Sequence, residues 1–158
     1  QHGTILIFEL YYRLCKDNLK KPVHMFFSGQ DAPCLRKKTA KKHILPDDEF
    51  LEEVIKLGGT PKEVLENKEL LQDVLPILRS DFKLIENYVY RKREDKIECN
   101  VTVFSGKEDD ITLEELLAWK NHCNRGFKVY TMEGNHFFIN DNTKNITNII
   151  SGLCKRDK

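Results

Sequence analysis

The sequence lacks the features of a disulfide-rich, metal-binding or membrane-spanning protein. Its five cysteines are odd in number and widely spaced, without a C-x-x-C pair, which argues against a disulfide framework and a zinc site. No apolar run approaches the ~20 residues of a membrane-spanning helix, and the first residues do not resemble a secretory signal. These absences predict a protein of the reducing cytoplasm that needs no metal and has no membrane partner.

Net charge is nearly absent as well. Lys and Arg number 26 and Asp and Glu number 25, so the formal charge is +1 and no overall field draws the chain toward nucleic acid. One local exception is "LRKKTAKKH" (35–43), a basic run without interleaved aromatic residues. Because nucleic-acid sites usually combine both kinds of residue, we predict no nucleic-acid partner.

The 158 residues are 40% hydrophobic, which suits a single domain with an ordinary core. Apolar spacing predicts a helix over about 4–19, followed by a buried strand at 23–28. Helical patterns then fill the segment up to residue 93, interrupted by Gly58-Gly59 and three prolines. The predicted helix N-caps in this all-helical insertion are Asp47 or Asp48, and Thr60 ahead of Pro61.

Alternation of strands and helices resumes after the insertion. The patterns predict strands at 99–104 and 127–132, a helix over 112–123 between them, and a terminal helix over 145–156. Strand, loop and helix repeated in this order are typical of parallel βαβ units. The predicted fold class is therefore α/β, with a parallel sheet flanked by helices.

Ionisable residues follow two of these strands. "SGKEDD" comes after strand 99–104, and "EGNH" comes after strand 127–132. Because functional groups in parallel sheets collect beyond the carboxyl ends of the strands, an Asp and a His there can form a catalytic pair. The alternative from composition alone is that the acidic residues are solvated turn formers and the His is a packed side chain.

Five separated motifs occur in one order along the chain. They are "LGGTPKEVLENKE", "LPILRSDFKLIENYVY", "NVTVFSGKEDD", Ala118-Trp119 and "GNHFFI". Together they resemble the type II (external) thioesterases of nonribosomal peptide and polyketide synthetases, over about residues 3–154. The resemblance implies part of an α/β-hydrolase with an inserted helical lid, here about 44–93, and one (partial) domain over 1–158.

The resemblance also implies site residues. It assigns the catalytic acid to Asp109, with Asp110 as the neighbouring alternative, and the catalytic base to His136. In such enzymes the histidine deprotonates a serine and later activates the water that clears the acyl-enzyme. The Gly134-Asn135 turn would present the imidazole, while Phe137 and Phe138 pack the loop beneath it.

The first residues of the chain differ from the family's nucleophile motif. The family holds its serine in a G-H-S-x-G elbow, and the alignment makes Gly3 the last glycine of that motif, so Gln1 stands at the serine position. The backbone of His2 would then lie at the oxyanion hole. The chain is therefore interpreted as the C-terminal portion of a longer enzyme, with a degenerate homologue as the alternative.

Other nucleophiles and ligands are weaker candidates. Ser28 follows a strand but lacks a base beside it, Cys34 and Cys99 also lack one, and His24, Cys34 and His43 match no common metal-ligand spacing. The predicted site therefore contains no metal and no bound cofactor. The basic run 35–43 is either a solvated segment or a docking surface for an acidic carrier protein or its phosphopantetheine phosphate.

The predicted function is hydrolysis of acyl thioesters from the phosphopantetheine arm of acyl or peptidyl carrier proteins, in nonribosomal peptide, polyketide or fatty-acid biosynthesis. Two alternatives are a non-catalytic homologue that binds carrier proteins, and an ester hydrolase on the same fold. An incomplete sheet would also expose an apolar edge, so we predict self-association of this chain. Acyl-chain length and the synthetase served do not follow from the sequence.

Overall fold

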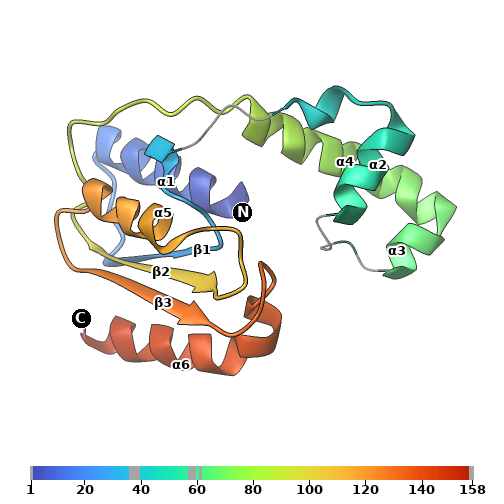
Figure 1. Ribbon diagram of the computed structural model, residues 1–158. Helices are drawn as coiled ribbons and strands as arrows, with labels where there is room; N and C mark the ends of the chain where they lie inside the picture. Colours follow the sequence, from blue (N-terminus) through green and yellow to red (C-terminus); the bar gives the residue numbers. More distant parts are fainter. Residues whose placement is uncertain (1, 36–39, 57–59, 61, 157–158) are drawn as a thin grey trace. The chain divides into compact units, whose positions relative to one another are not determined.

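A computed structural model describes residues 2–35, 40–56, 60 and 62–156 of the chain (Figure 1). The chain divides into two compact units. The first, the sheet unit, comprises residues 1–36 and 90–158, and the second, the helical unit, comprises residues 37–89. The helical unit coincides with the predicted lid apart from its ends, which were placed at 44 and 93. The prediction that both units act as one domain stays a prediction.

Three parallel strands form the sheet. They are β1 (His24–Ser28), β2 (Asn100–Gly106) and β3 (Phe127–Met132), in the spatial order β1-β2-β3. Both strand pairs are parallel, with Phe27 opposite Val103 and Val103 opposite Val129. The central strand β2 is buried from Val101 to Gly106, as expected for a strand covered on both faces. The predicted parallel α/β sheet is thus confirmed, and the predicted bounds of the last strand match those of β3.

Helices cover both faces of this sheet. Figure 1 shows α1 (His2–Lys16) and α5 (Leu113–Leu117) on one side and α6 (Ile139–Arg156) on the other. Side chains alternate between faces along a strand, so Phe27 packs with the α1 and α5 residues while its neighbour Phe26 packs with the α6 residues. A short 3-10 helix, η1 (Pro33–Leu35), follows β1.

Three helix boundaries differ from the predicted ones. Helix α1 ends at Lys16 because Asn18 takes a left-handed φ of 53° and Leu19 N–H donates to the Leu14 carbonyl, which closes the helix. The predicted helix 112–123 is divided into α5 and the 3-10 helix η3 (Ala118–His122). Helix α6 starts at Ile139 instead of 145, through a polar segment that has low helix propensity by itself.

Trp119 lies at the centre of the larger core. Its side chain is fully buried, with its ring stacked on Phe27 at 4.2 Å and edge-on to Phe8 at 5.8 Å between ring centroids. The indole Nε1–H donates to the Gln30 carbonyl at 3.0 Å. This residue therefore joins α1, β1 and the segment after β1 in a single packing arrangement.

His122 is a buried histidine in an aromatic setting. Its ring is edge-on to Phe8, Tyr90 and Trp119 at centroid distances of 5.4, 5.7 and 5.9 Å. Its Nε2 is buried without a hydrogen-bond partner. Burial, with a smaller contribution from Lys96, lowers the pKa of His122 below its ordinary value.

The free energy of unfolding should therefore fall in acid because of His122. A histidine whose pKa is lowered on folding binds fewer protons in the folded state, so its contribution is present above the unfolded pKa of about 6.5 and is lost as pH falls from there through the folded value. We expect His122→Phe to reduce the slope of unfolding free energy against pH over this window. Urea unfolding from pH 7 to 5 measures the slope, and equal slopes in both proteins would contradict the prediction.

The helical unit contains η2 (Lys42–Ile44), α2 (Asp47–Lys56), α3 (Lys62–Glu66) and α4 (Lys68–Glu86). Asp47 and Asp48 lie in the first turn of α2, which corrects their assignment as N-caps, because the helix already includes them. The Gly58-Gly59 break and Pro61 lie outside the described residues, so the Thr60 cap stays a prediction. Asn67 caps α4 by accepting from the backbone N–H groups of Glu69 and Leu70.

Polar contacts connect η2 to α4. Glu86 accepts from the backbone N–H groups of Lys42 and His43 and bonds the His43 ring, while Arg79 donates to the His43 and Leu45 carbonyls at 2.6 and 2.7 Å. Burial raises the pKa of Glu86, but the hydrogen bonds from His43 and Lys42 outweigh it and leave the pKa lowered. These contacts show that the end of the basic run 35–43 is part of the packed helical unit.

Lys42 in the basic run is also paired. Its ammonium lies 2.6 Å from Glu53, and hydrogen bonds first from Lys42 and then from Lys56 lower the pKa of Glu53 to about 2. Residues 36–39 of the run lie outside the described residues. Carrier docking by this run therefore stays a prediction, with Lys42 already engaged within the unit.

The edge strand β1 supports the predicted self-association. Beside it lies a hollow of about 510 Å³ whose lining is mostly apolar and includes Ile7, Leu10 and Phe26, with Lys20, Lys21 and His24 as its basic members. Leu10 is 54% exposed. Strand edges and exposed apolar groups both favour association between copies. We expect a dimer or larger assembly by light scattering and a shift toward monomer in Leu10→Lys. A monomer at all concentrations would contradict the prediction.

Among the described residues, no helix is sufficiently long and apolar to cross a membrane.

Candidate functional site

Asp109 and His136 meet at the carboxyl edge of the sheet. Asp109 follows β2, and His136 lies between β3 and α6. Because β2 and β3 are parallel neighbours, their following loops emerge side by side. Backbone hydrogen bonds connect the loops: Lys107 N–H donates to the Met132 carbonyl at 2.8 Å and Glu108 N–H to the Gly134 carbonyl at 3.1 Å.

The two side chains form a hydrogen bond. Asp109 Oδ2 lies 2.9 Å from His136 Nδ1, with the carboxylate side chain 5% exposed and the imidazole 27% exposed. An ionised carboxylate only accepts, so Nδ1–H donates and a neutral ring carries its lone pair on Nε2. This is the tautomer of a general base. The neighbouring Asp110 is exposed, so the structure brings together Asp109 and His136 of the predicted residues.

The aromatic residues after His136 lie largely as predicted. Phe138 is fully buried in the smaller core with Phe104 and Met132, and the Phe137 ring stands edge-on to the His136 ring at 5.4 Å. Phe137 N–H also donates to the Asn135 side-chain carbonyl at 2.9 Å. The loop is thus held from beneath by a buried ring and locally by an Asn side chain.

Gly106 is a residue that sequence reasoning missed as part of this site. A Cβ at this position would lie 2.3 Å from the carbonyl oxygens of both Gly134 and Asn135. The last residue of β2 must therefore lack a side chain for the His136 loop to approach it. Gly134 takes a φ of 106°, which also favours glycine. The only signal for this in the sequence was a glycine at the end of a strand or within two residues after it, namely Gly29, Gly106 and Gly134.

The other sequence candidates lie in different settings. Ser28 Oγ is buried at the end of β1 without a hydrogen-bond partner. Desolvation raises the pKa of the Cys34 thiol, and Cys99 is buried, so neither environment favours a reactive thiolate. His2 is the first residue of α1, and its predicted oxyanion role stays a prediction. Gln1 lies outside the described residues.

Two of the residues whose spacing matches no common metal-ligand set, His24 and His43, contact other side chains. His24 Nε2 lies 2.9 Å from Thr102 Oγ1, and the His43 ring bonds Glu86. Among residues 2–35, 40–56, 60 and 62–156, no group of three or more His, Cys, Asp or Glu side chains is arranged to hold a metal ion.

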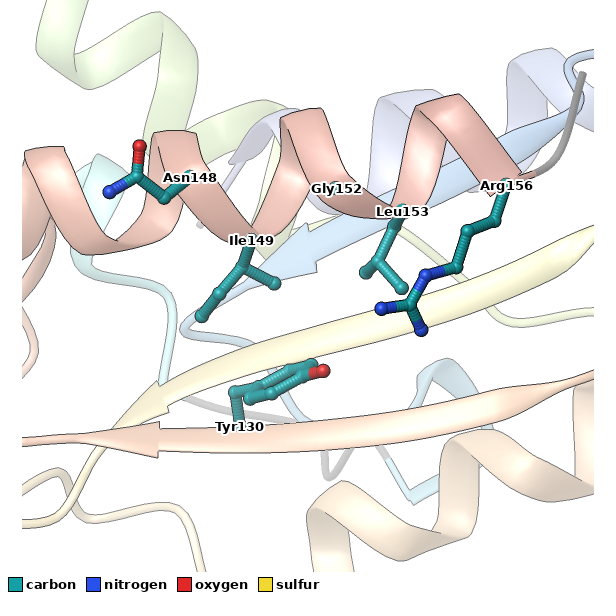
Figure 2. Close-up of a pocket in the computed structure, with 6 residues that line it drawn as sticks. All are labelled: Tyr130, Asn148, Ile149, Gly152, Leu153 and Arg156. Carbon is teal, nitrogen blue, oxygen red and sulfur yellow. The ribbon is translucent and has the colours of Figure 1, made fainter.

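A separate hollow lies between β3 and α6. Figure 2 shows the side chains of Tyr130, Ile149 and Leu153 around it, and its volume is about 290 Å³. Asn148, Gly152 and Arg156 complete its lining. Asp109 and His136 do not line this hollow, so it is separate from the Asp109–His136 pair.

Comparison with known proteins identifies the family. A family model described as "Thioesterase domain" matches residues 3–154. The chain belongs to the thioesterase domain family. Linear gramicidin dehydrogenase LgrE of Brevibacillus parabrevis is 40% identical over 157 residues, an alignment that covers 97% of this chain and 59% of LgrE.

Two solved structures, one of them a type II thioesterase, are similar to the chain. ClbQ from the colibactin NRPS/PKS pathway superimposes with a TM-score of 0.92 and 31% identity, covering 99% of this chain and 66% of that chain. The type II thioesterase BorB from the borrelidin biosynthetic cluster superimposes with a TM-score of 0.84 and 29% identity, covering 96% of this chain and 62% of the BorB chain. The α/β-hydrolase fold and the resemblance to type II thioesterases are thus confirmed. The chain spans less than two thirds of the length of these three relatives.

Proposed function

We propose that this thioesterase domain contributes the acid and base for hydrolysis of acyl thioesters on the phosphopantetheine arm of carrier proteins. The observation that carries the proposal is the Asp109–His136 hydrogen bond of 2.9 Å at the carboxyl edge of a parallel sheet. Membership of the thioesterase family supports the thioester as the bond that is cleaved. ClbQ comes from the colibactin NRPS/PKS pathway, and this similarity supports carrier-bound acyl groups as the substrates of the present chain.

The proposed mechanism uses a serine hydroxyl, the pair and one water. His136 Nε2 takes the serine proton as the oxygen attacks the thioester carbonyl, and Asp109 stabilises the imidazolium. The C–S bond then breaks, and the proton passes to the leaving thiolate. In the second half, His136 takes a proton from water, hydroxide adds to the acyl-serine, and the released serine regains its proton. These steps use only protein groups and water, so we propose no cofactor and no metal.

The nucleophile determines what this chain does alone. The resemblance to the family places Gln1 at the serine position, and the amide of glutamine has no hydroxyl oxygen to attack the carbonyl. We therefore expect no thiol release from an acyl-phosphopantetheinyl carrier protein by this chain alone. Release that is lost in His136→Ala would show another nucleophile or direct attack by water, and would contradict the serine mechanism.

A second experiment tests whether the acid and base are poised. The N-terminal portion of a thioesterase relative, up to and including the G-H-S-x of its elbow, is joined ahead of Gly3, which completes the motif. We expect thiol release that requires the new serine and His136. A folded fusion that binds the carrier protein without releasing thiol would contradict hydrolysis and favour the alternative of a non-catalytic carrier-binding homologue. Release from a simple oxygen ester, without release from the thioester, would favour an ester hydrolase.

We propose acyl or peptidyl carrier proteins as the partners. Their acidic surfaces suit local basic groups, and residues 35–43 are the candidate contact, with a solvated segment as the other interpretation of this run. Free thiols such as Cys15, Cys34 and Cys154 fit a reducing compartment, so we propose a cytoplasmic location.

A further inference from the structure

Gly29 takes an unusual backbone conformation at the end of β1. Its φ is +57°, in the left-handed region that most side chains disfavour. Its N–H donates to the Phe104 carbonyl of β2 at 2.9 Å, which extends the β1–β2 pairing past Ser28 and fixes the position of Gly29. Gly29 is therefore at the same edge of the sheet as Asp109 and His136.

The His136 ring lies directly beside Gly29. A Cβ on Gly29 would be 3.0 Å from His136 Cε1, 3.5 Å from Nδ1 and 3.7 Å from Nε2. The Cε1 atom lies between the two ring nitrogens, so this edge of the imidazole faces Gly29. A contact of 3.0 Å is tighter than an ordinary carbon–carbon contact of about 3.5–4.0 Å, so a side chain at this position would displace the ring.

We propose that Gly29 is a positioning residue for His136, an inference that rests on the proposed function of the Asp109–His136 pair. The imidazole is held through Nδ1 by Asp109 after β2, while Gly29 after β1 leaves room for the edge that carries both nitrogens. His136 itself follows β3, so each of the three strands contributes one residue to the orientation of the ring. Proton transfer depends on this orientation, because small misplacements of a catalytic group reduce the rate.

Two substitutions distinguish the effect of an added Cβ beside His136 from the effect of backbone strain at the positive φ of Gly29. Gly29→Ala adds a Cβ beside His136 and also forces alanine into a positive φ. Gly29→Asn adds the same Cβ, but asparagine adopts the left-handed region at much lower cost. Gly152→Ala is the control, since Gly152 lies within α6 without a positive φ and nothing lies within 4 Å of an added Cβ.

The measured quantity is the NMR signal of the His136 Nδ1–H proton, observed in the full chain with 15N-labelled histidine. The chain has five histidines, so His136→Ala assigns the signal. We expect a downfield Nδ1–H signal in the parent and in Gly152→Ala. It should be broadened or lost in both Gly29 variants, although Gly29→Asn keeps nearly the parent melting temperature by circular dichroism.

A parent-like His136 signal in Gly29→Asn would overturn the inference, because glycine would then be required only by the backbone. In the fusion that contains serine, we expect Gly29→Asn to lower kcat about tenfold or more with little change in KM. An unchanged kcat would also overturn it. Failure of the proposed function is distinguishable: a fusion without thiol release whose His136 signal still depends on Gly29 overturns hydrolysis and leaves the positioning role supported.

Discussion

Asp109→Asn, made in the fusion that contains the serine elbow, is expected to lower kcat/KM by a factor of about 10³ to 10⁴. The amide has nearly the shape of the carboxylate, so the fold should be unchanged. It has no negative charge to stabilise the imidazolium, however, and its NH₂ group can donate to Nδ1 and favour the wrong tautomer of His136. The measurement is the rate of thiol release from an acyl carrier protein.

Asp110→Asn provides the matched control for this prediction. It makes the same chemical change one residue along the same loop, at an exposed side chain, whereas the Asp109 carboxylate is 5% exposed and bonded to His136. We expect its kcat/KM to stay within about twofold of the parent, as for most surface substitutions away from a site. A large loss in Asp110→Asn with little loss in Asp109→Asn would reverse the assignment of the acid.

Trp119→Ala is expected to destabilise the chain by about 3–5 kcal/mol. The substitution removes a fully buried indole and its stacking on Phe27, and it leaves the Gln30 carbonyl without its donor. Because domains of this size are stable by about 5–15 kcal/mol, a large part of the folding free energy would be lost. Urea unfolding followed by circular dichroism measures the change.

Leu113→Ala is the control for the Trp119 prediction, because Leu113 lies in the adjacent helix α5 but is 57% exposed. We expect it to change the free energy of unfolding by only about 0.5 kcal/mol. The free energy of unfolding of Trp119→Phe should lie between those of Trp119→Ala and Leu113→Ala, since it keeps a ring in the core and loses the Nε1–H donor. Equal stability of Trp119→Ala and the parent would show that this cluster does not hold the sheet unit together.

Local patterns were sufficient for the elements that have a single periodicity. The strand over Phe127–Met132 and the helical insertion were both predicted, because alternation and helical spacing depend on neighbouring residues. Helix α6 was predicted to begin too late, since polar residues after Ile139 have low helix propensity alone. In the structure the preceding Phe138 is buried in the core, where tertiary packing outweighs propensity.

The sequence by itself determined the α/β class, the family resemblance and the loops that hold the proposed acid and base, because motif order and strand ends are local properties of the chain. Only the tertiary structure decided that Asp109, and not Asp110, contacts His136, and that Gly29 and Gly106 make room for the ring and its loop. These contacts join residues that are distant in the sequence. Their distances depend on the register and packing of three strands, which no local pattern contains.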